Sequence, residues 1–410
     1  MKNTRVCMLV YTLYDTDARV RREAETLVAT GQYDVSVLTL KDQATPRHYV
    51  LDGVRIEQLN VGKYRGSNAV KYILSYVQFT VLAFWQVTRR ALAGNVDVMH
   101  IHNMPNFLIF AALVPLLQRR KIVLDVHDTM PETFASSFSG WKKRVFVPLL
   151  TLEERICAML ADHVICVNEV QRDALVRRQP NVARKTAISM NVPDPARFAR
   201  VPAGARPASS QGLKLVYHGT LSGRLTVDSA IRAMHAVASQ APDIELHIIG
   251  DGDARPELEQ VARELGVAER VVLHGRMKLD DLVPVLRSMD AGIVPLERNP
   301  ATELMLSVKL MECLSQGIPV IAPRLAGIQR YFTEDMLFFF DPGDVPSLSQ
   351  AILAARDPSE RTRRVRAAES FLTQYSWDTH KSSLLEIYGY SANASSSADG
   401  AVTRDATSRA

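Results

Sequence analysis

Short runs of Val, Ile and Leu alternate along the chain with longer segments of helical period. The first series of runs covers residues 5–11, 35–40, 96–101, 121–126 and 163–167. The second series covers residues 213–217, 244–249, 271–273, 291–295, 319–322 and 337–340. Apolar runs separated by helical segments are typical of βαβ units, whose parallel strands are buried on both faces. We therefore expect an α/β protein with two parallel sheets.

A change in composition separates the two series. Residues 200–212 are rich in Pro, Ala, Gly and Ser, which is typical of an exposed connection. We predict an N-terminal domain over 1–199, a linker over 200–212 and a C-terminal domain over 213–376. A helical pattern over 377–390 is expected to pack back toward the N-terminal domain. The Ser- and Ala-rich residues 391–410 are expected to be disordered.

Composition and charge narrow the class of protein. The 410 residues, 47% of them hydrophobic, suffice for two cores. Four cysteines without paired spacing, and no cleavable leader after the apolar stretch 6–13, predict a cytoplasmic protein. The net charge of +5 comes from the residues up to Pro195. No nucleic-acid-binding motif accompanies these basic residues, so a phosphate-bearing substrate or an anionic membrane surface explains them better than nucleic acid does.

One uncharged stretch, 72–88, is flanked by Lys71, Arg89 and Arg90. It is shorter than the ~20 apolar residues of a spanning helix and includes polar side chains. A buried helix that covers the first sheet is the favoured interpretation, and an interfacial helix is the alternative. A basic and aromatic patch at 141–147 makes peripheral attachment to the inner face of the plasma membrane a hypothesis.

Ligands bind at the carboxyl ends of the strands in open parallel sheets, so the residues after each run are candidates. The first run is not followed by the glycines of a dinucleotide fingerprint, which argues against NAD or FAD. Asp17 and Arg19, near a helix start, have two interpretations. They present a phosphate-binding helix end, or they are simply an N-cap and a solvated residue.

Histidines follow two later runs of the first series. His102 and Asn103 follow one of them, and His127 and Asp128 follow the next. Both pairs are expected at the mouth of the cleft. His127 is the favoured candidate for chemistry, whereas a structural role is favoured for His102. The compact spacing of a metal site is absent, so we expect no metal.

Glycine and basic residues follow the runs of the second domain. The candidates for ligand binding are Gly219, Thr220, Arg224, Arg276 and Met277. Glycine permits close approach of a ligand to the backbone, and arginine binds phosphate well. Asp251 and Asp253 look like a metal-binding DxD pair, but the glycines beside them fit a tight strand-to-helix turn better.

The region 295–322 is the most informative. A polar loop leads to a helix that starts near Ser307, and a glycine and a proline close the helix before another buried strand. A helix N-terminus can hold a diphosphate. Glu312, about a turn and a half further in, could accept both hydroxyls of a ribose.

Together these motifs resemble retaining glycosyltransferases of the GT-B fold, family 4, of the bacterial surface-polysaccharide type. The segments that carry the resemblance are 17–24, 100–103, 125–132, 217–221, 309–312 and 317–320. The resemblance implies two Rossmann-like domains that face a central cleft. It also implies an enzyme that retains anomeric configuration and uses neither a cofactor nor a metal.

The resemblance further implies roles for the candidate residues. The C-terminal domain would hold a UDP- or GDP-sugar, with Glu312 on the ribose. Near the diphosphate and the base would lie Arg224, the amides of Leu306 and Ser307, and Arg276 with Met277. His127 would face the transferred sugar. The basic N-terminal domain suits a polyprenyl-diphosphate-linked glycan acceptor of exopolysaccharide or lipopolysaccharide biosynthesis.

The chain departs from the family pattern at one position. Many members have two glutamates separated by seven residues, and Leu304 occupies the first of these positions. Either Glu303 takes the sugar-binding role through a shifted loop, or backbone groups do so. Lys309 is a candidate phosphate ligand, although a salt bridge would suit it equally. The alternative functions are a nucleotide-sugar 2-epimerase and a non-catalytic sugar-nucleotide-binding component of a membrane assembly.

Overall fold

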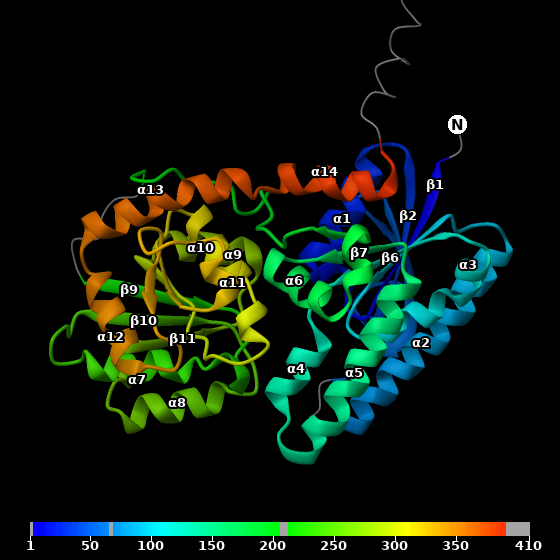
Figure 1. The fold of residues 1–410 in the computed structure, drawn as a ribbon. Helices are drawn as coiled ribbons and strands as arrows, with labels where there is room; N and C mark the ends of the chain where they lie inside the picture. The colour runs from blue at the N-terminus through cyan, green and yellow to red at the C-terminus, as the bar shows by residue number, and fades with distance from the viewer. Residues whose placement is uncertain (1–2, 65–68, 206–211, 391–410) are drawn as a thin grey trace, which may run out of the picture.

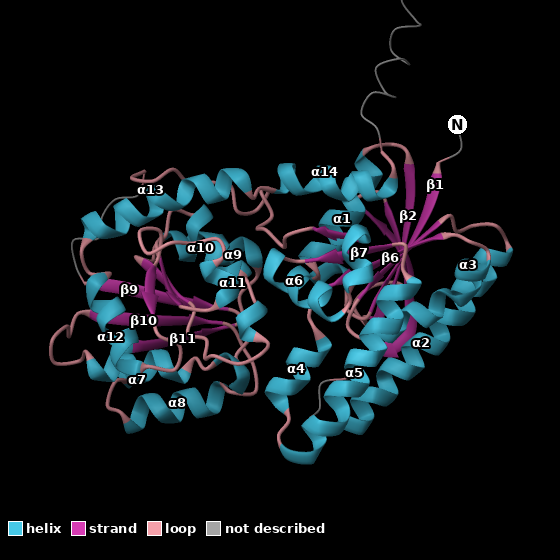
Figure 2. Ribbon diagram, in the orientation of Figure 1, coloured by secondary structure: helices cyan, strands magenta, loops and turns pink. Residues whose placement is uncertain are grey.

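The computed structural model describes residues 3–64, 69–205 and 212–390. Two lobes lie side by side, and each consists of a sheet covered by helices (Figure 1, Figure 2). The predicted α/β architecture with two sheets is confirmed. Part of the predicted linker, 206–211, and the predicted disordered tail, 391–410, lie outside the described residues.

The N-terminal lobe contains an eight-stranded sheet in the order β3-β4-β2-β1-β5-β6-β7-β8. Its strands are β1 (Thr4–Val10), β2 (Tyr33–Lys41), β3 (His48–Leu51), β4 (Val54–Gly62), β5 (Val98–His102), β6 (Lys121–Val126), β7 (His163–Cys166) and β8 (Thr186–Ile188). The strands pair in parallel except for the antiparallel β3 and β4. The apolar runs did not predict β3, β4 and β8, because β3 and β4 mix exposed with buried positions near the edge and β8 is very short.

Helices cover the faces of this sheet. They are α1 (Ala18–Ala29), α2 (Ala69–Leu92), α3 (Leu113–Leu117), α4 (Met130–Ser137), α5 (Gly140–Leu160) and α6 (Glu169–Arg178), with the 3-10 turns η1 (Tyr14–Thr16), η2 (Asn106–Ala112) and η3 (Pro180–Lys185). Helix α2 spans the uncharged stretch 72–88. Phe79, Ala83 and Val87 on one of its faces are buried, but its opposite face is exposed. The favoured interpretation of a buried helix is therefore correct for only half of its circumference.

The C-terminal lobe contains a six-stranded parallel sheet in the order β11-β10-β9-β12-β13-β14. Its strands are β9 (Leu213–His218), β10 (Ile244–Ile249), β11 (Val271–Gly275), β12 (Ala291–Ile293), β13 (Val320–Pro323) and β14 (Phe338–Phe340). The connecting helices and turns are α7 (Asp228–Ala236), α8 (Arg255–Glu264), α9 (Leu279–Arg287), α10 (Val308–Ser315), α11 (Ala326–Gln329), α12 (Val345–Ala354), η4 (Gly223–Leu225), η5 (Ala268–Arg270) and η6 (Thr302–Leu304). Every run of the second series forms one of these strands, and all of them except the edge strand β11 are buried at nearly every position.

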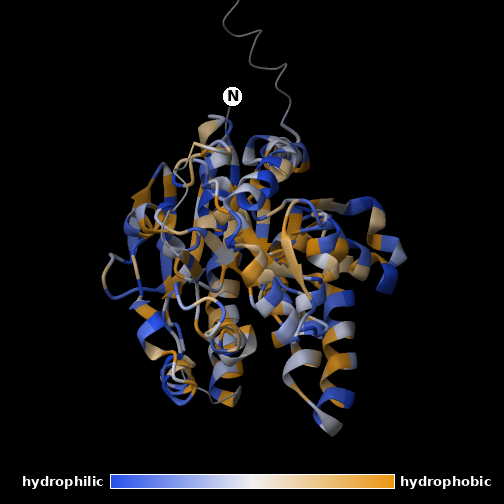
Figure 3. Ribbon diagram, turned by 90° about the vertical axis from the view of Figure 1, so that its left-hand side faces the viewer, coloured by the Kyte–Doolittle hydropathy of each residue, from blue (hydrophilic) through white to orange (hydrophobic). Residues whose placement is uncertain are grey.

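Helices α13 (Pro358–Gln374) and α14 (Trp377–Tyr388) follow one another along the same side of both lobes (Figure 1). Helix α14 packs against α1 of the N-terminal lobe. Trp377 Nε1 donates to Thr26 Oγ1 over 3.1 Å, and Lys121 Nζ donates to the Ile387 carbonyl over 2.9 Å. A single hydrophobic core continues from one lobe into the other, and the central strands are coloured as hydrophobic in Figure 3. The end of the chain therefore ties the lobes together.

Candidate active site

The donor side of the site begins at the end of β9. Nε2 of His218 lies 2.7 Å from a carboxylate oxygen of Glu312, which projects from α10. Both side chains are largely buried. His218 was not predicted as a site residue, although it directly follows the run 213–217 and precedes the predicted Gly219. The tertiary structure alone joins it to Glu312.

Gly219 lets Lys309 reach the same point. The glycine has φ +138°, and a Cβ atom there would lie only 1.9 Å from Cε of Lys309. The lysine side chain thus crosses the glycine backbone. Burial lowers the pKa of Lys309, although the negative charge of Glu312 opposes this shift. The salt-bridge and phosphate-ligand interpretations of Lys309 are compatible, because a buried ammonium near one carboxylate can also attract a diphosphate.

The N-terminus of α10 lies beside this group. Ser307 is the buried N-cap residue, and its side chain does not cap the helix. Leu306 packs against the hydrophobic core. The first amides of a helix lack intrahelical partners, so this end can bind an anion. The predicted helix start near Ser307 agrees with the structure.

The loop before α10 is held from two directions. The Glu303 carboxylate forms an ion pair with Arg298 and accepts a 2.7 Å hydrogen bond from the Ala326 amide. The Leu304 carbonyl accepts a 2.8 Å hydrogen bond from Asn168 Nδ2 of the other lobe. The Glu303 carboxylate is thus paired within its own lobe.

The remaining candidates of the C-terminal lobe lie around its strand ends. Thr220 is exposed, and its carbonyl accepts a 2.8 Å hydrogen bond from the Tyr217 hydroxyl. Arg276 is exposed after β11, whereas Met277 packs partly against the core. The Arg224 side chain lies outside the described part of the structure.

The N-terminal lobe presents His127 directly after β6. Asn103 Oδ1 accepts a 2.7 Å hydrogen bond from the His127 amide, and Gln171 Nε2 donates to the His127 carbonyl over 3.3 Å. The backbone amide of Gln171 donates to Asn168 Oδ1, and Asn168 Nδ2 donates to the Leu304 carbonyl. His127 is therefore linked through Asn168 and Gln171 to the loop of the other lobe. Asp128, the next residue, is exposed.

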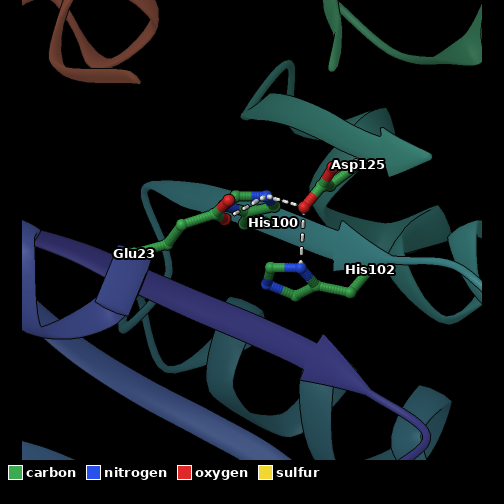
Figure 4. A group of neighbouring side chains, drawn as sticks. All are labelled: Glu23, His100, His102 and Asp125. Carbon is green, nitrogen blue, oxygen red and sulfur yellow. Dashed lines mark hydrogen bonds and ion pairs between the residues drawn. The ribbon is translucent and has the colours of Figure 1, made fainter. Parts of the chain in front are cut away.

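A cluster of buried carboxylate and imidazole groups, formed by Glu23, His100, His102 and Asp125 (Figure 4), contacts His127 through Asp125. Asp125 Oδ2 lies 2.9 Å from His127 Nε2 and 3.0 Å from His102 Nδ1. Arg19 forms ion pairs with Asp125 and with Glu23, one turn along α1. His102 is fully buried at its contact with Asp125. Asp125 and Glu23 were not predicted as site residues.

Burial and pairing shift the pKa values of the two carboxyl groups of this cluster, Glu23 and Asp125, in opposite directions. Burial raises the pKa of Glu23 to about 7, and the neighbouring charge of Asp125 adds to the shift. Burial acts in the same direction on Asp125, but Arg19 and His127 outweigh it and hold its pKa well below the usual range. Asp125 is therefore the ionised partner of Arg19.

Four residues of this region have the composition of a metal site. Potential ligand atoms of Glu23, His100, His102 and Asp125 all lie within 4.8 Å of one another. Arg19, however, already supplies a positive charge to both carboxylates. We therefore describe the group as an ion-pair cluster.

The structure shows that Asp17 is an N-cap, as one of its two interpretations has it. For Arg19, both interpretations, a phosphate ligand and a solvated residue, are wrong. Asp17 is the N-cap of α1, and its carboxylate accepts from the Val20 amide over 3.2 Å. Arg19 is only 3% exposed and points into the ion-pair cluster. It is thus neither a solvated residue nor available to a phosphate, because both buried carboxylates require its charge.

Two lobes of largely parallel sheets covered by helices, with Glu312 and the N-terminus of α10 on one lobe and His127 on the other, have the architecture of GT-B glycosyltransferases. Residues 16–191 match the family model described as "Glycosyl transferase 4-like domain", and residues 212–357 match the family model described as "Glycosyl transferases group 1". The chain belongs to the group 1 glycosyltransferases, in agreement with the predicted family 4.

Curated relatives support this membership. The chain is 24% identical over 296 residues to a glycogen synthase of Mycobacterium tuberculosis (strain ATCC 25618 / H37Rv), covering 71% of this chain and 68% of that protein. It is 27% identical over 168 residues to the lipopolysaccharide core biosynthesis glycosyltransferase LpsE of Rhizobium meliloti (strain 1021), covering 40% of this chain and 47% of that protein. The protein is therefore a glycosyltransferase.

Solved structures share the fold. A sucrose-phosphate synthase from Thermosynechococcus elongatus aligns with a TM-score of 0.75 at 19% identity, covering 94% of this chain and 98% of that chain. HepE of Anabaena, solved in complex with UDP-glucose, aligns with a TM-score of 0.69 at 15% identity, covering 94% of this chain and 100% of that chain. These likenesses confirm the predicted GT-B fold.

Proposed function

We propose that this enzyme is a retaining hexosyltransferase that moves a sugar from a UDP- or GDP-sugar to a polyprenyl-diphosphate-linked glycan, in exopolysaccharide or lipopolysaccharide biosynthesis. The observation that carries the proposal is the convergence of Glu312, His218 and Lys309 around Gly219, beside the N-terminus of α10. The carboxylate suits a ribose, and the lysine and helix end suit a diphosphate. The structural likeness to HepE solved with UDP-glucose supports a nucleotide-sugar donor.

The proposed chemistry needs neither a protein nucleophile nor a metal ion. The bond from the anomeric carbon to the diphosphate breaks, and a bond to the acceptor oxygen forms on the same face of the sugar. The departing phosphate oxygen takes the proton of the acceptor hydroxyl. Lys309 and the α10 N-terminus stabilise the charge that develops on the diphosphate, and His127 contacts the transferred sugar from the other lobe.

A donor panel tests this function. We expect release of one nucleoside diphosphate, UDP or GDP, only when a lipid-linked glycan acceptor is present, with the new bond in the configuration of the donor. Inversion of the anomeric carbon would contradict retention. Formation of an epimer from the donor alone would identify a nucleotide-sugar 2-epimerase instead.

The lipid-linked acceptor is inferred from an exposed apolar face of the N-terminal lobe. Among the described residues, the exposed large hydrophobic side chains lie on α2, α3 and α5, and the exceptions are Val50 and Val272. Most of them recur with helical spacing. On α2 they are Val70, Ile73, Leu74, Val77, Val81 and Trp85, and on α5 they are Trp141, Val145, Leu149, Leu152 and Ile156. Both helices pack against η2. An exposed apolar surface of this extent usually marks an interaction site.

Charge on α5 favours an anionic membrane as the partner of this face. The exposed charges recorded on α5 are the basic residues Lys142, Lys143, Arg144 and Arg155. Its two acidic residues turn inward: Glu153 accepts from Asn106 over 3.0 Å, and Glu154 pairs with Arg178. Apolar stripes with adjacent basic residues suit helices that lie in the interface of anionic lipids.

The same face lies close to the site along the chain. Helix α4 begins three residues after His127, leads directly into α5 and packs against it. No helix among the described residues is long and apolar enough to cross a bilayer. We therefore propose peripheral attachment at the inner membrane face, with α2 and α5 lying against the lipid and the cleft open to a membrane-bound acceptor.

Vesicle sedimentation tests the attachment. We expect the protein to sediment with phosphatidylglycerol vesicles more than with phosphatidylcholine vesicles, and less in high salt. The double variant Val145→Ser/Leu149→Ser should reduce binding several-fold, whereas Val50→Ser/Val272→Ser, which changes exposed valines elsewhere, should not. Equal binding of the two double variants would contradict the proposal. Dimers in sedimentation velocity that only the α5 variant abolishes would instead show that a second copy covers this face.

A further inference from the structure

One oxygen of Asp125 faces two imidazole nitrogens. Oδ2 lies 2.9 Å from His127 Nε2 and 3.0 Å from His102 Nδ1, and the two nitrogens are 3.1 Å apart. Arg19 holds the other oxygen, Oδ1. An ionised carboxylate only accepts hydrogen bonds, so a nitrogen that bonds to it carries a proton, whereas the bond between the two nitrogens forms only if one of them lacks a proton. Asp125 Oδ2 has lone pairs for both.

We infer that Asp125 fixes His127 as the tautomer protonated on Nε2, so that Nδ1 offers its lone pair to a hydroxyl of the transferred sugar. Asp125 is thereby a positioning residue, because it acts through His127 and does not touch the sugar. The inference rests on the proposed role of His127, but the tautomer itself is a property of the free protein.

The surroundings of His127 support this orientation. Its backbone is held on both sides, because the amide donates to Asn103 and the carbonyl accepts from Gln171. The His127 side chain is 20% exposed, whereas those of His102 and Asp125 are fully buried. The ring therefore has a buried edge, which bonds to Asp125, and an accessible edge.

Asp125 stays ionised because its charge is compensated. Arg19, together with hydrogen bonds from His102 and His127, outweighs the effect of burial on Asp125 and holds its pKa well below the usual range. Glu23, the other carboxyl beside Arg19, has a pKa raised by burial to about 7. A neutral Asp125 could donate its own proton and leave the tautomer open, so the ion pair with Arg19 decides the direction of the hydrogen bond.

The cluster is also anchored from the end of the chain. His100 stacks on His102, with ring centroids 4.2 Å apart, and its Nδ1 lies 2.7 Å from the Tyr388 hydroxyl of α14. Burial lowers the pKa of His100 well below its usual value, so this ring is neutral. Tyr388 and His100 therefore support the rings without adding charge, which leaves Asp125 as the group that selects the tautomer.

The enzyme should therefore prefer a nucleotide-sugar whose sugar carries a hydroxyl that can donate a hydrogen bond to Nδ1 of His127. A neutral Nδ1 accepts a hydrogen bond, and a hydroxyl of the bound sugar can donate it. A donor sugar that lacks the contacted hydroxyl should be turned over at least tenfold more slowly, since sites built around a hydrogen bond discriminate strongly.

Nitrogen-15 NMR of the histidine-labelled protein without substrate tests the tautomer. We expect long-range correlations in which His127 Nε2 is protonated and Nδ1 is not, with the assignment made by His127→Gln. Asp125→Asn should mix the tautomers and lower turnover more than tenfold, with less than threefold change in donor affinity. Tyr388→Phe should leave the His127 tautomer unchanged.

Two results would overturn the inference. One is a wild-type His127 protonated on Nδ1 alone, which can be measured even if Asp125→Asn does not fold. The other is the same tautomer change in Tyr388→Phe as in Asp125→Asn, since general loosening of the cluster would then explain both. Because the spectra need no donor or acceptor, failure of the proposed transfer reaction would leave this result intact.

Discussion

Nε2 of His218 lies 2.7 Å from a carboxylate oxygen of Glu312, and this contact joins the end of β9 to the middle of α10. The strand end and the helix are separated by 94 positions in the sequence. One oxygen of Glu312 is thus held before a nucleotide arrives. Preorganisation of this kind reduces the side-chain entropy that ribose binding costs.

Replacing Glu312 should weaken nucleotide binding. In Glu312→Ala, the charge-assisted hydrogen bonds to the two ribose hydroxyls are lost, each worth about 1.5–3 kcal/mol, so we expect the dissociation constant of the nucleoside diphosphate to rise at least about a hundredfold. Isothermal titration calorimetry measures this directly. Unchanged affinity for every nucleoside diphosphate would exclude Glu312 from the ribose site.

Glu303 offers a contrasting carboxylate. It already pairs with Arg298 and accepts from the Ala326 amide over 2.7 Å, so Glu303→Gln should change the Michaelis constant for the donor by less than about threefold while lowering the melting temperature slightly. Steady-state kinetics with the preferred donor provides the measurement. A tenfold or larger loss would show that Glu303 takes the sugar-binding role instead.

A methyl group at Gly219 should displace Lys309. Gly219→Ala places a Cβ 1.9 Å from Lys309 Cε, at a positive φ that costs roughly 1–3 kcal/mol for other residues. We expect both lower stability and weaker diphosphate binding, measured by urea unfolding and calorimetry. Gly223→Ala is the matched control, because its Cβ would meet nothing within 4 Å. Similar losses in both variants would contradict this explanation.

The buried Glu23 should make stability depend on pH. Its pKa is about 7 in the folded protein and near the ordinary glutamate value in the unfolded chain, so the folded state binds more protons between these values. The contribution of Glu23 to the free energy of unfolding therefore falls as pH rises from about 4.5 to 7.

Glu23→Gln removes this dependence. From pH 5 to pH 8, wild type should lose on the order of 2–3 kcal/mol relative to Glu23→Gln, as measured by urea midpoints. Glu386→Gln, an exposed position on α14, should follow wild type. A wild type that gains stability relative to Glu23→Gln over this interval would mean that Glu23 is ionised throughout in the folded state.

The sequence by itself determined the six strands of the C-terminal sheet, five of the eight strands of the N-terminal sheet, and the strand-end candidates of the C-terminal lobe. Each apolar run of the second series became a strand, and for all of them except the partly exposed edge strand β11 the reason is that a parallel strand buried on both faces has to be apolar along its length. Gly219, Ser307 and Glu312 could be placed because strand ends and helix starts bring them to one edge of the sheet. His127 was found for the same reason.

Tertiary structure alone decided the partners of these residues. His218 and Glu312, Asp125 and Arg19, and Tyr388 and His100 are far apart in the sequence, and hydrophobic periodicity reports burial without naming the atom that a polar group meets. The same limit explains Arg19, which the sequence left as a phosphate ligand or a solvated residue. Burial between two carboxylates, which depends on how α1 packs on the sheet, gave it a third role.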